Sequence, residues 1–176
     1  MIRRALPADA RACVDIYNYY IENTIVTLET TPLSEEAFAE RIRTISAAYP
    51  YFVWEDDETH AVGGYAYLSA FSPRGAYRFT CDVSIYLDKD LRGRGIGHQL
   101  MDAVTDAGRA MGLHTVLAVV TSENEPSMRF HTREGFVFES RLEHLAFKMG
   151  RWMGICYYRR DLFPRTDAEP EELTAQ

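Results

Sequence analysis

The chain has 176 residues, 47% of them hydrophobic and 26% charged, as is typical of one soluble globular domain with its own core. Its formal net charge of −7 argues against a nucleic-acid-binding protein, and no apolar run approaches the ~20 residues of a membrane span, so we expect neither nucleic acid nor a membrane as partner. Residues 1–5 lack the apolar stretch of a signal peptide, and Cys13, Cys81 and Cys156 are widely spaced. We therefore predict a cytoplasmic protein with buried free thiols and no metal site; a reactive cysteine is the alternative.

The first third of the chain predicts a strand, two helices and a connecting loop. Residues 2–6 alternate weakly, as in a strand, and from Asp9 the apolar residues fall at helical spacing. Residues 25–31 look extended, and their connecting position suggests a loop that lines a pocket. Ser34 can cap a second helix, which Pro50 closes.

The middle of the chain predicts three strands. Residues 51–55 and 61–68 flank a polar turn and form a hairpin, in which two glycines at 63–64 suggest a bulge. Residues 76–87 are predicted to be one long strand. Alternation gives it one apolar face that packs on the core and one polar face that can line a cleft. The polar face holds Thr80, Asp82, Ser84 and Tyr86.

Two helices and a strand follow. A helix is expected from about His98 to Gly112, where glycine suits the position after a helix end. The unbroken apolar run at 115–120 predicts a strand covered on both faces. Asn124 can cap a short helix that ends at Gly135.

The C-terminal part predicts two more strands and a tail. The strands cover residues 136–142 and 153–162 and are joined by a turn at 148–152. Residues 164–176 are polar and acidic without apolar periodicity, so we expect a disordered tail.

A glycine-rich turn, Arg92-Gly93-Arg94-Gly95-Ile96-Gly97, lies between the long strand and the next helix. Alternate glycines let the backbone curl so that several N–H groups face one anion, and the helix adds the positive end of its dipole. The sequence therefore predicts a phosphate-binding turn flanked by arginines, with an ordinary glycine-rich turn as the alternative. Neither the Walker-type loop nor the dinucleotide fingerprint fits this spacing.

The motif Arg92-x-x-Gly95-x-Gly97 resembles the acyl-CoA pyrophosphate loop of the GNAT superfamily of N-acetyltransferases. The order of the expected elements over residues 2–162 is similar to that of a whole GNAT domain. Further segments resemble the phosphinothricin acetyltransferase branch, which acetylates small amino-acid amines such as phosphinothricin, methionine sulfone and methionine sulfoximine. These segments are residues 49–50, 64–67, 74–77, 84–86, 124–131, 135–136 and 147–152.

The resemblance implies an α/β (α+β) GNAT domain over residues 1–163. Its mixed, mostly antiparallel sheet of about seven strands would contain a splayed parallel pair and be flanked by about four helices. The resemblance also implies a homodimer, acetyl-CoA as donor and a pantetheine arm between the splayed strands. The implied cofactor-binding residues are Ile85, Tyr86, Leu87, Arg92, Gly93, Arg94, Gly95, Ile96, Gly97, His98, Asn124 and Arg133. The implied acceptor-binding residues are Arg74, Gly75, Ala76 and Tyr77, and the guanidinium of Arg74 suits a carboxylate.

Acetyl transfer to an amine requires a base for the ammonium proton and stabilisation of the thioester oxygen, and the departing thiolate takes up a proton. Where the family has a glutamate, this chain has the shorter Asp82, which is predicted to act directly, to act through a water, or to bind the ammonium. A carboxylate satisfied by its neighbours is the alternative. Main-chain N–H groups at a bulge near residues 85–87 are the expected oxyanion donors. The resemblance implies His131 as an acid or base.

These observations favour an N-acetyltransferase that moves acetyl from acetyl-CoA to the α-amine of a small amino acid or toxic analogue, in a ternary complex. Two alternatives stay open. The acceptor could be a polyamine, an aminoglycoside or a peptide N-terminus, which an acidic cleft would favour. The chain could also be a non-catalytic acyl-CoA-binding module, for which the shortened Asp82 is the only support.

Overall fold

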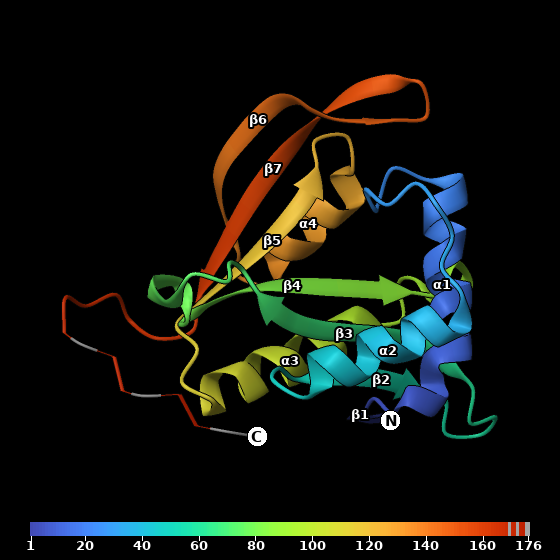
Figure 1. The fold of residues 1–176 in the computed structure, drawn as a ribbon, viewed down its shortest axis with the longest axis horizontal. Coiled ribbons are helices and arrows are strands. Elements are labelled where there is room, and N and C mark those ends of the chain that lie inside the picture. Colours follow the sequence, from blue (N-terminus) through green and yellow to red (C-terminus); the bar gives the residue numbers. More distant parts are fainter. Residues whose placement is uncertain (169, 172, 175–176) are drawn as a thin grey trace.

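The computed structural model describes residues 1–168, 170–171 and 173–174. These residues form one seven-stranded sheet, in the order β1-β2-β3-β4-β5-β7-β6, and four α-helices (Figure 1). Neighbouring strands are antiparallel except β4 and β5, which are parallel. The expected mixed sheet with a parallel pair is therefore confirmed.

The elements follow one another largely as predicted. The N-terminal half contains β1 (Ile2–Arg4), α1 (Ala10–Asn23), α2 (Glu35–Ser46), β2 (Tyr51–Glu55), β3 (Val62–Ala70) and β4 (Thr80–Leu87). The C-terminal half contains α3 (Ile96–Ala110), β5 (Thr115–Thr121), α4 (Glu125–Arg133), β6 (Val137–Lys148) and β7 (Arg151–Asp161).

Local signals in the sequence explain several of these bounds. The Ser34 hydroxyl accepts a hydrogen bond from the Ala37 N–H at 3.1 Å, which caps α2 as predicted. The Asn124 side chain accepts one from the Ser127 N–H at 3.3 Å and caps α4 in the same way. The β2–β3 register shifts at Trp54/Glu55, opposite the predicted glycine bulge.

Two hydrophobic cores lie on opposite faces of the sheet. In β3, Tyr65 belongs to the core under α1 and α2, whereas the next residue, Ala66, belongs to the core under α3. Successive strand residues point to opposite faces, so this switch separates the two layers. Helices α1 and α2 cover the β2–β4 half of one face, and β6 and β7 extend beyond them (Figure 1).

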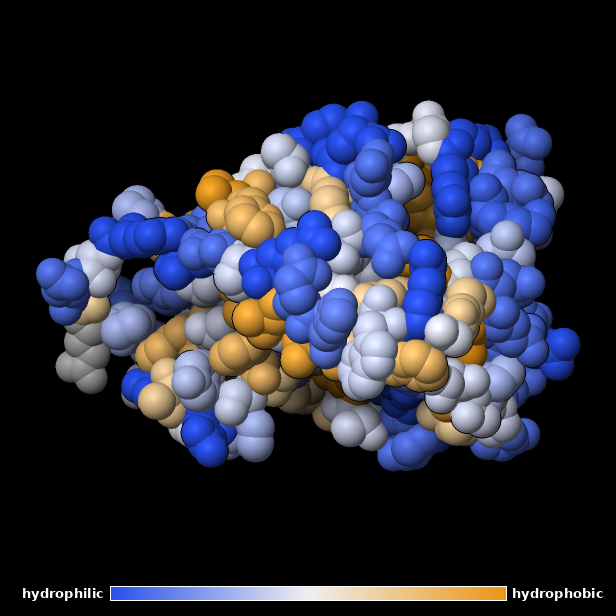
Figure 2. All heavy atoms as spheres, turned by 90° about the horizontal axis from the view of Figure 1, so that it is seen from above, coloured by the Kyte–Doolittle hydropathy of each residue, from blue (hydrophilic) through white to orange (hydrophobic). Residues whose placement is uncertain are grey.

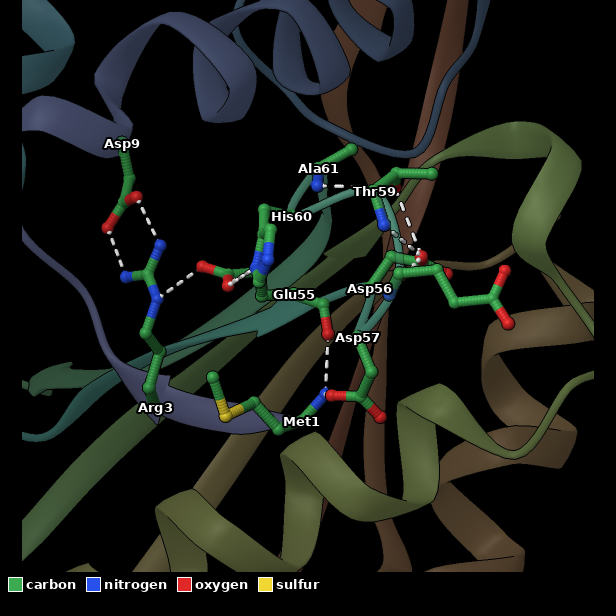
Figure 3. Close-up of polar contacts among 10 residues, drawn as sticks. Met1, Arg3, Asp9, Glu55, Asp56, Asp57, Thr59, His60 and Ala61 are labelled. Carbon is green, nitrogen blue, oxygen red and sulfur yellow. Dashed lines mark hydrogen bonds and ion pairs between the residues drawn. The ribbon is translucent and has the colours of Figure 1, made fainter.

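A polar network fastens the N-terminus to the sheet and to α1 (Figure 3). The Arg3 guanidinium donates to Asp9 at 2.7 Å and to Glu55 at 2.7 Å, joining β1, the start of α1 and the end of β2. Burial of Asp9 acts to raise the pKa of its carboxyl, but the bonds from Arg3 and the Leu6 N–H outweigh it and leave the pKa lowered.

Two expectations about strands are wrong in detail. The predicted strand at 76–87 begins only at Thr80, and a 3₁₀ turn occupies Gly75–Tyr77. The reason is that β3 ends at Ala70, which pairs with Cys81, so the preceding residues have no strand beside them. The turn expected at 148–152 shrinks to 149–150, because β6 and β7 both extend toward it. Nearly every β6 residue is exposed, so its sequence carries no one-sided apolar pattern.

One face of β5 is fully covered, and the other is covered only in part. Val116, Ala118 and Val120 are buried, but Val119 is 44% exposed, so the expectation of cover on both faces is wrong. An apolar run does not distinguish a strand buried by its own chain from one with an open apolar face.

The predicted tail is only partly described. Residues 169, 172, 175 and 176 lie outside the described residues. Within the described part, the Thr174 N–H donates to the Met111 carbonyl at 3.0 Å, at the end of α3. Among the described residues, no helix has both the length and the apolar character needed to cross a membrane.

Candidate active site

The site begins where the two parallel strands separate. Pairing between β4 and β5 runs from Thr80↔Thr115 to Asp82↔Leu117, whereas β4 continues to Leu87. The last residues of β4 therefore keep a partner only on the β3 side and present an open edge toward β5. The β3–β4 register is continuous from Gly64↔Leu87 to Ala70↔Cys81, so the bulge expected in β4 is absent from this pairing.

The glycine turn leads from this open edge into α3. Gly93 has φ +79° and Gly95, the residue before the helix, has φ +77°, a left-handed conformation that side chains disfavour. Helix α3 begins at Ile96, two residues earlier than predicted. A Cβ on Gly97 would lie 3.1 Å from the Phe130 ring, so this glycine lets α3 pack closely against α4. The free N–H groups of the first helical turn thus lie beside the turn, as an anion site requires.

A cavity of about 550 Å³ fills the space between the open strand edge, the glycine turn and α4. It is lined by all but one of the predicted cofactor residues. The residues lining it are Tyr20, Val26, Ile85, Tyr86, Leu87, Arg92, Gly93, Gly95, Ile96, Gly97, His98, Asn124, Pro126, Ser127, Phe130, Arg133 and Glu134. The exception is Arg94, an exposed residue outside this lining. An elongated anionic ligand with an apolar arm fits the chemistry of this lining.

Sequence reasoning missed Tyr20, which reaches the cavity from α1. Its hydroxyl donates to the Leu87 carbonyl at 2.6 Å and accepts from the Arg92 guanidinium at 2.9 Å. The helical spacing of Tyr20 indicated only a buried position, and nothing local in the sequence connects it with residues about seventy positions away.

Asp82 stands at the fork, on the last residue pair before β4 and β5 separate. Its Oδ1 atom is buried and has no hydrogen-bond partner among the described residues. Burial raises the pKa of this carboxyl to about 6. A carboxylate satisfied by its neighbours, the alternative considered above, does not fit an unpartnered oxygen. Asp82 lies outside the cavity lining and marks the closed end of the open strand edge.

His131 is buried in α4, with 4% of its surface exposed, and does not line the cavity. Its Nδ1 lies 2.9 Å from the Ser127 carbonyl, which can only accept, so Nδ1 carries the proton of the neutral ring. Its ring packs edge-on against Phe130 and Phe136. Burial lowers the pKa of His131, so the ring is neutral at pH 7 with a lone pair on Nε2.

The predicted acceptor residues do not meet the cavity. Arg74, Gly75, Ala76 and Tyr77 form an exposed turn before β4, and Tyr77 packs edge-on against Phe71. They lie five to eight positions before Asp82 along the chain, on the side of the fork away from the glycine turn.

His98, Asp102 and Glu134 bring three potential metal ligands together at the cavity rim. Both imidazole nitrogens already face carboxylates, at 2.9 Å from Glu134 and 3.3 Å from Asp102. The hydrogen bond to Glu134 is the main reason that the pKa of His98 is raised. The two carboxylates account for both ring nitrogens of His98, which links α3 to the end of α4.

Comparisons with known proteins define the class. The model of the acetyltransferase (GNAT) family matches residues 13–136. The chain therefore belongs to the GNAT family and is an acetyl-CoA-dependent N-acetyltransferase.

Similar proteins point to one branch of that family. A phosphinothricin acetyltransferase from Sinorhizobium meliloti, solved in complex with AcCoA, is 38% identical, with a TM-score of 0.92 over 98% of this chain and 93% of that one. The phosphinothricin N-acetyltransferase of Streptomyces viridochromogenes is 30% identical over 91% of this chain and 86% of its own length. The L-methionine sulfoximine/L-methionine sulfone acetyltransferase of Pseudomonas paraeruginosa is 33% identical over 95% and 97%. The expected resemblance to this branch is confirmed.

Proposed function

We propose that this enzyme transfers acetyl from acetyl-CoA to the α-amine of a small amino acid or a toxic analogue, such as phosphinothricin, methionine sulfone or methionine sulfoximine. The transfer is direct, within a ternary complex. The observation that carries the proposal is the Asp82 carboxyl, which has a free buried oxygen and a pKa of about 6 at the fork of the splayed strands. A carboxyl with such a pKa is mostly ionised at pH 7 and still basic enough to accept a proton.

In the proposed reaction the donor lies in the cavity with its diphosphate at the glycine turn. The N–H groups around Gly93, Gly95 and His98 and the charge of Arg92 hold the diphosphate. The open edge of residues 85–87 holds the pantetheine arm through main-chain bonds. That arm leads the thioester toward Asp82, and main-chain N–H groups of the same edge stabilise the oxygen that gains charge.

Asp82 then removes a proton from the acceptor ammonium, directly or through one water. The free amine attacks the thioester carbon, the C–N bond forms and the C–S bond breaks. The nitrogen then gives up its second proton, and CoA leaves as a thiolate that takes up a proton from solvent. We assign His131 a supporting role as a proton acceptor, since its lone pair is on Nε2 and burial lowers its pKa. Donation of a proton to the departing thiolate suits this neutral ring less well.

Incubation with acetyl-CoA and a panel of amines, followed by measurement of released thiol, tests the proposal. The three cysteines of the chain are buried, so they add little background. Thiol release with methionine sulfone, methionine sulfoximine or phosphinothricin supports it. Release only with polyamines, aminoglycosides or peptide N-termini would assign another acceptor class. No release with any amine, although CoA binds, would identify a non-catalytic acyl-CoA-binding module.

We further propose a homodimer formed through the open face of β5, β7 and β6. Val119, Val137 and Leu142 are 44%, 65% and 45% exposed, and the strand registers place all three on this face. Figure 2 looks down on the end of the molecule that carries β6 and β7 and shows hydrophobic surface among hydrophilic side chains. A light-scattering mass of one chain at every concentration tested would contradict the dimer.

Two further proposals concern location and organisation. We place the enzyme in the cytoplasm, which its three free, buried cysteines support, and expect no nucleic acid among its partners. We take residues 1–163 as the acetyltransferase domain and 164–176 as a tail.

A further inference from the structure

Helix α1 reaches the donor cavity through one side chain, Tyr20. This residue is 4% exposed, and its hydroxyl makes two hydrogen bonds. Because the hydroxyl hydrogen points to the Leu87 carbonyl, the bond with Arg92 uses an oxygen lone pair. The hydroxyl therefore joins the last residue of β4 to the first residue of the glycine turn.

The Arg92 side chain has few polar contacts besides this one. In the described part of the chain, the Tyr20 hydroxyl is its one hydrogen-bond partner, and no carboxylate lies within ion-pair distance of it. The guanidinium also lies over the Tyr20 ring, 5.4 Å from its centre. Arg92 is thus held by a neutral group, and its positive charge stays available to an anion at the cavity rim.

We propose that Tyr20 is a positioning residue for the diphosphate of the acyl donor, acting through Arg92. The assignment rests on the proposed role of the glycine turn in binding acetyl-CoA. A free arginine side chain loses conformational freedom when it binds phosphate, and Tyr20 removes that freedom beforehand. The same hydroxyl holds the end of β4, the strand proposed to bind the pantetheine arm, next to the glycine turn. The distance between the two parts of the proposed donor site is therefore fixed.

The test compares Tyr20→Phe with Tyr19→Phe, a matched change on the same helix at a residue 36% exposed. Calorimetry gives the dissociation constant for CoA, and kinetics give kcat/KM for acetyl-CoA and for acetyl-pantetheine, which lacks the nucleotide diphosphate. Loss of a hydrogen bond to a charged group should weaken CoA binding about 5- to 30-fold in Tyr20→Phe and leave Tyr19→Phe unchanged. In Tyr20→Phe, kcat/KM should fall less for acetyl-pantetheine than for acetyl-CoA.

A double-mutant cycle with Arg92→Gln separates positioning from packing. If Tyr20 acts through Arg92, the double variant binds CoA about as weakly as Arg92→Gln alone. Additive losses, or equal losses for acetyl-CoA and acetyl-pantetheine, would overturn the inference, and melting temperatures identify variants that are simply unfolded. If the unmodified enzyme binds no CoA, both the proposed function and this inference fall. If it binds CoA and Tyr20→Phe binds it equally well, only the inference falls.

Discussion

The two sides of the β4–β5 fork differ in how far the chain encloses them. On the donor side, β4, the glycine turn and α4 enclose a cavity of about 550 Å³. On the side proposed to bind the acceptor, the Arg74–Tyr77 turn is exposed and the β5 face carries an uncovered Val119. The cavity is shaped mainly by backbone geometry, whereas the proposed acceptor side would depend on exposed side chains and on whatever covers the open face. Asp82 stands between the two halves, so changes there should affect chemistry more than binding.

The largest effect is expected for Asp82→Asn. If Asp82 is the proposed base, its removal should lower kcat/KM for the acceptor about 10²- to 10⁴-fold, the usual contribution of general base catalysis, while CoA binding stays unchanged. In the unmodified enzyme kcat/KM should rise with pH through about 6, because the carboxyl must be ionised to accept a proton. Asp82→Glu is the matched control, which keeps the charge and lengthens the side chain. If the Asp82→Asn enzyme keeps its activity, another residue acts as the base. Asp82 could then at most bind the ammonium group of the acceptor.

Gly95→Ala should damage the donor side selectively. Gly95 has φ +77°, and an L-residue with a Cβ costs roughly 1–2 kcal/mol in that region. We expect CoA affinity to fall about tenfold or more, with the acceptor KM little changed at saturating acetyl-CoA. Gly95→Asn is the control, since asparagine tolerates the left-handed conformation better than alanine. Equal affinity in all three proteins would show that the turn does not depend on this backbone geometry.

Arg74→Ala should affect the acceptor side alone. If Arg74 binds the acceptor carboxylate, its loss should raise the acceptor KM about tenfold, as for a lost charged hydrogen bond, and leave the acetyl-CoA KM unchanged. Arg78→Ala, in which the lost guanidinium lies over the Phe79 ring, is the matched control. A methionine sulfone amide, which lacks the carboxylate, should be used equally well by Arg74→Ala and the unmodified enzyme. A rise in KM for this amide as large as that for methionine sulfone would mean that Arg74 shapes the site without binding the carboxylate.

The same contrast explains what the sequence could predict. Much of the cavity lining comes from one continuous stretch, β4 to α3, whose glycines and helix start are visible locally, and the region of α4 adds Asn124 and Arg133. Nearly all of the predicted cofactor residues therefore line the cavity. The place of Tyr20 in the cavity was not predicted, because its partners, Leu87 and Arg92, are distant in sequence. The open face of β5 and the length of the β6–β7 pair were not predicted for a different reason. Hydrophobic pattern reports which residues prefer burial, and it does not report whether the same chain covers them.

The smallest effect should be a gain in stability from Asp82→Asn. Between the ordinary value of 3.8 and about 6, the folded state holds a proton that the unfolded state has released, so rising pH destabilises the unmodified protein through that window. Full linkage at 1.36 kcal/mol per pH unit would give about 3 kcal/mol, and solvent screening of a partly exposed carboxylate reduces it to about 1–2 kcal/mol. Chemical denaturation at pH 8 should therefore show the variant more stable by that amount, and the gain should shrink toward zero near pH 4. A gain in stability that persists at pH 4 would come from packing of the amide. The ionised carboxylate of Asp82 would then not be what destabilises the unmodified protein.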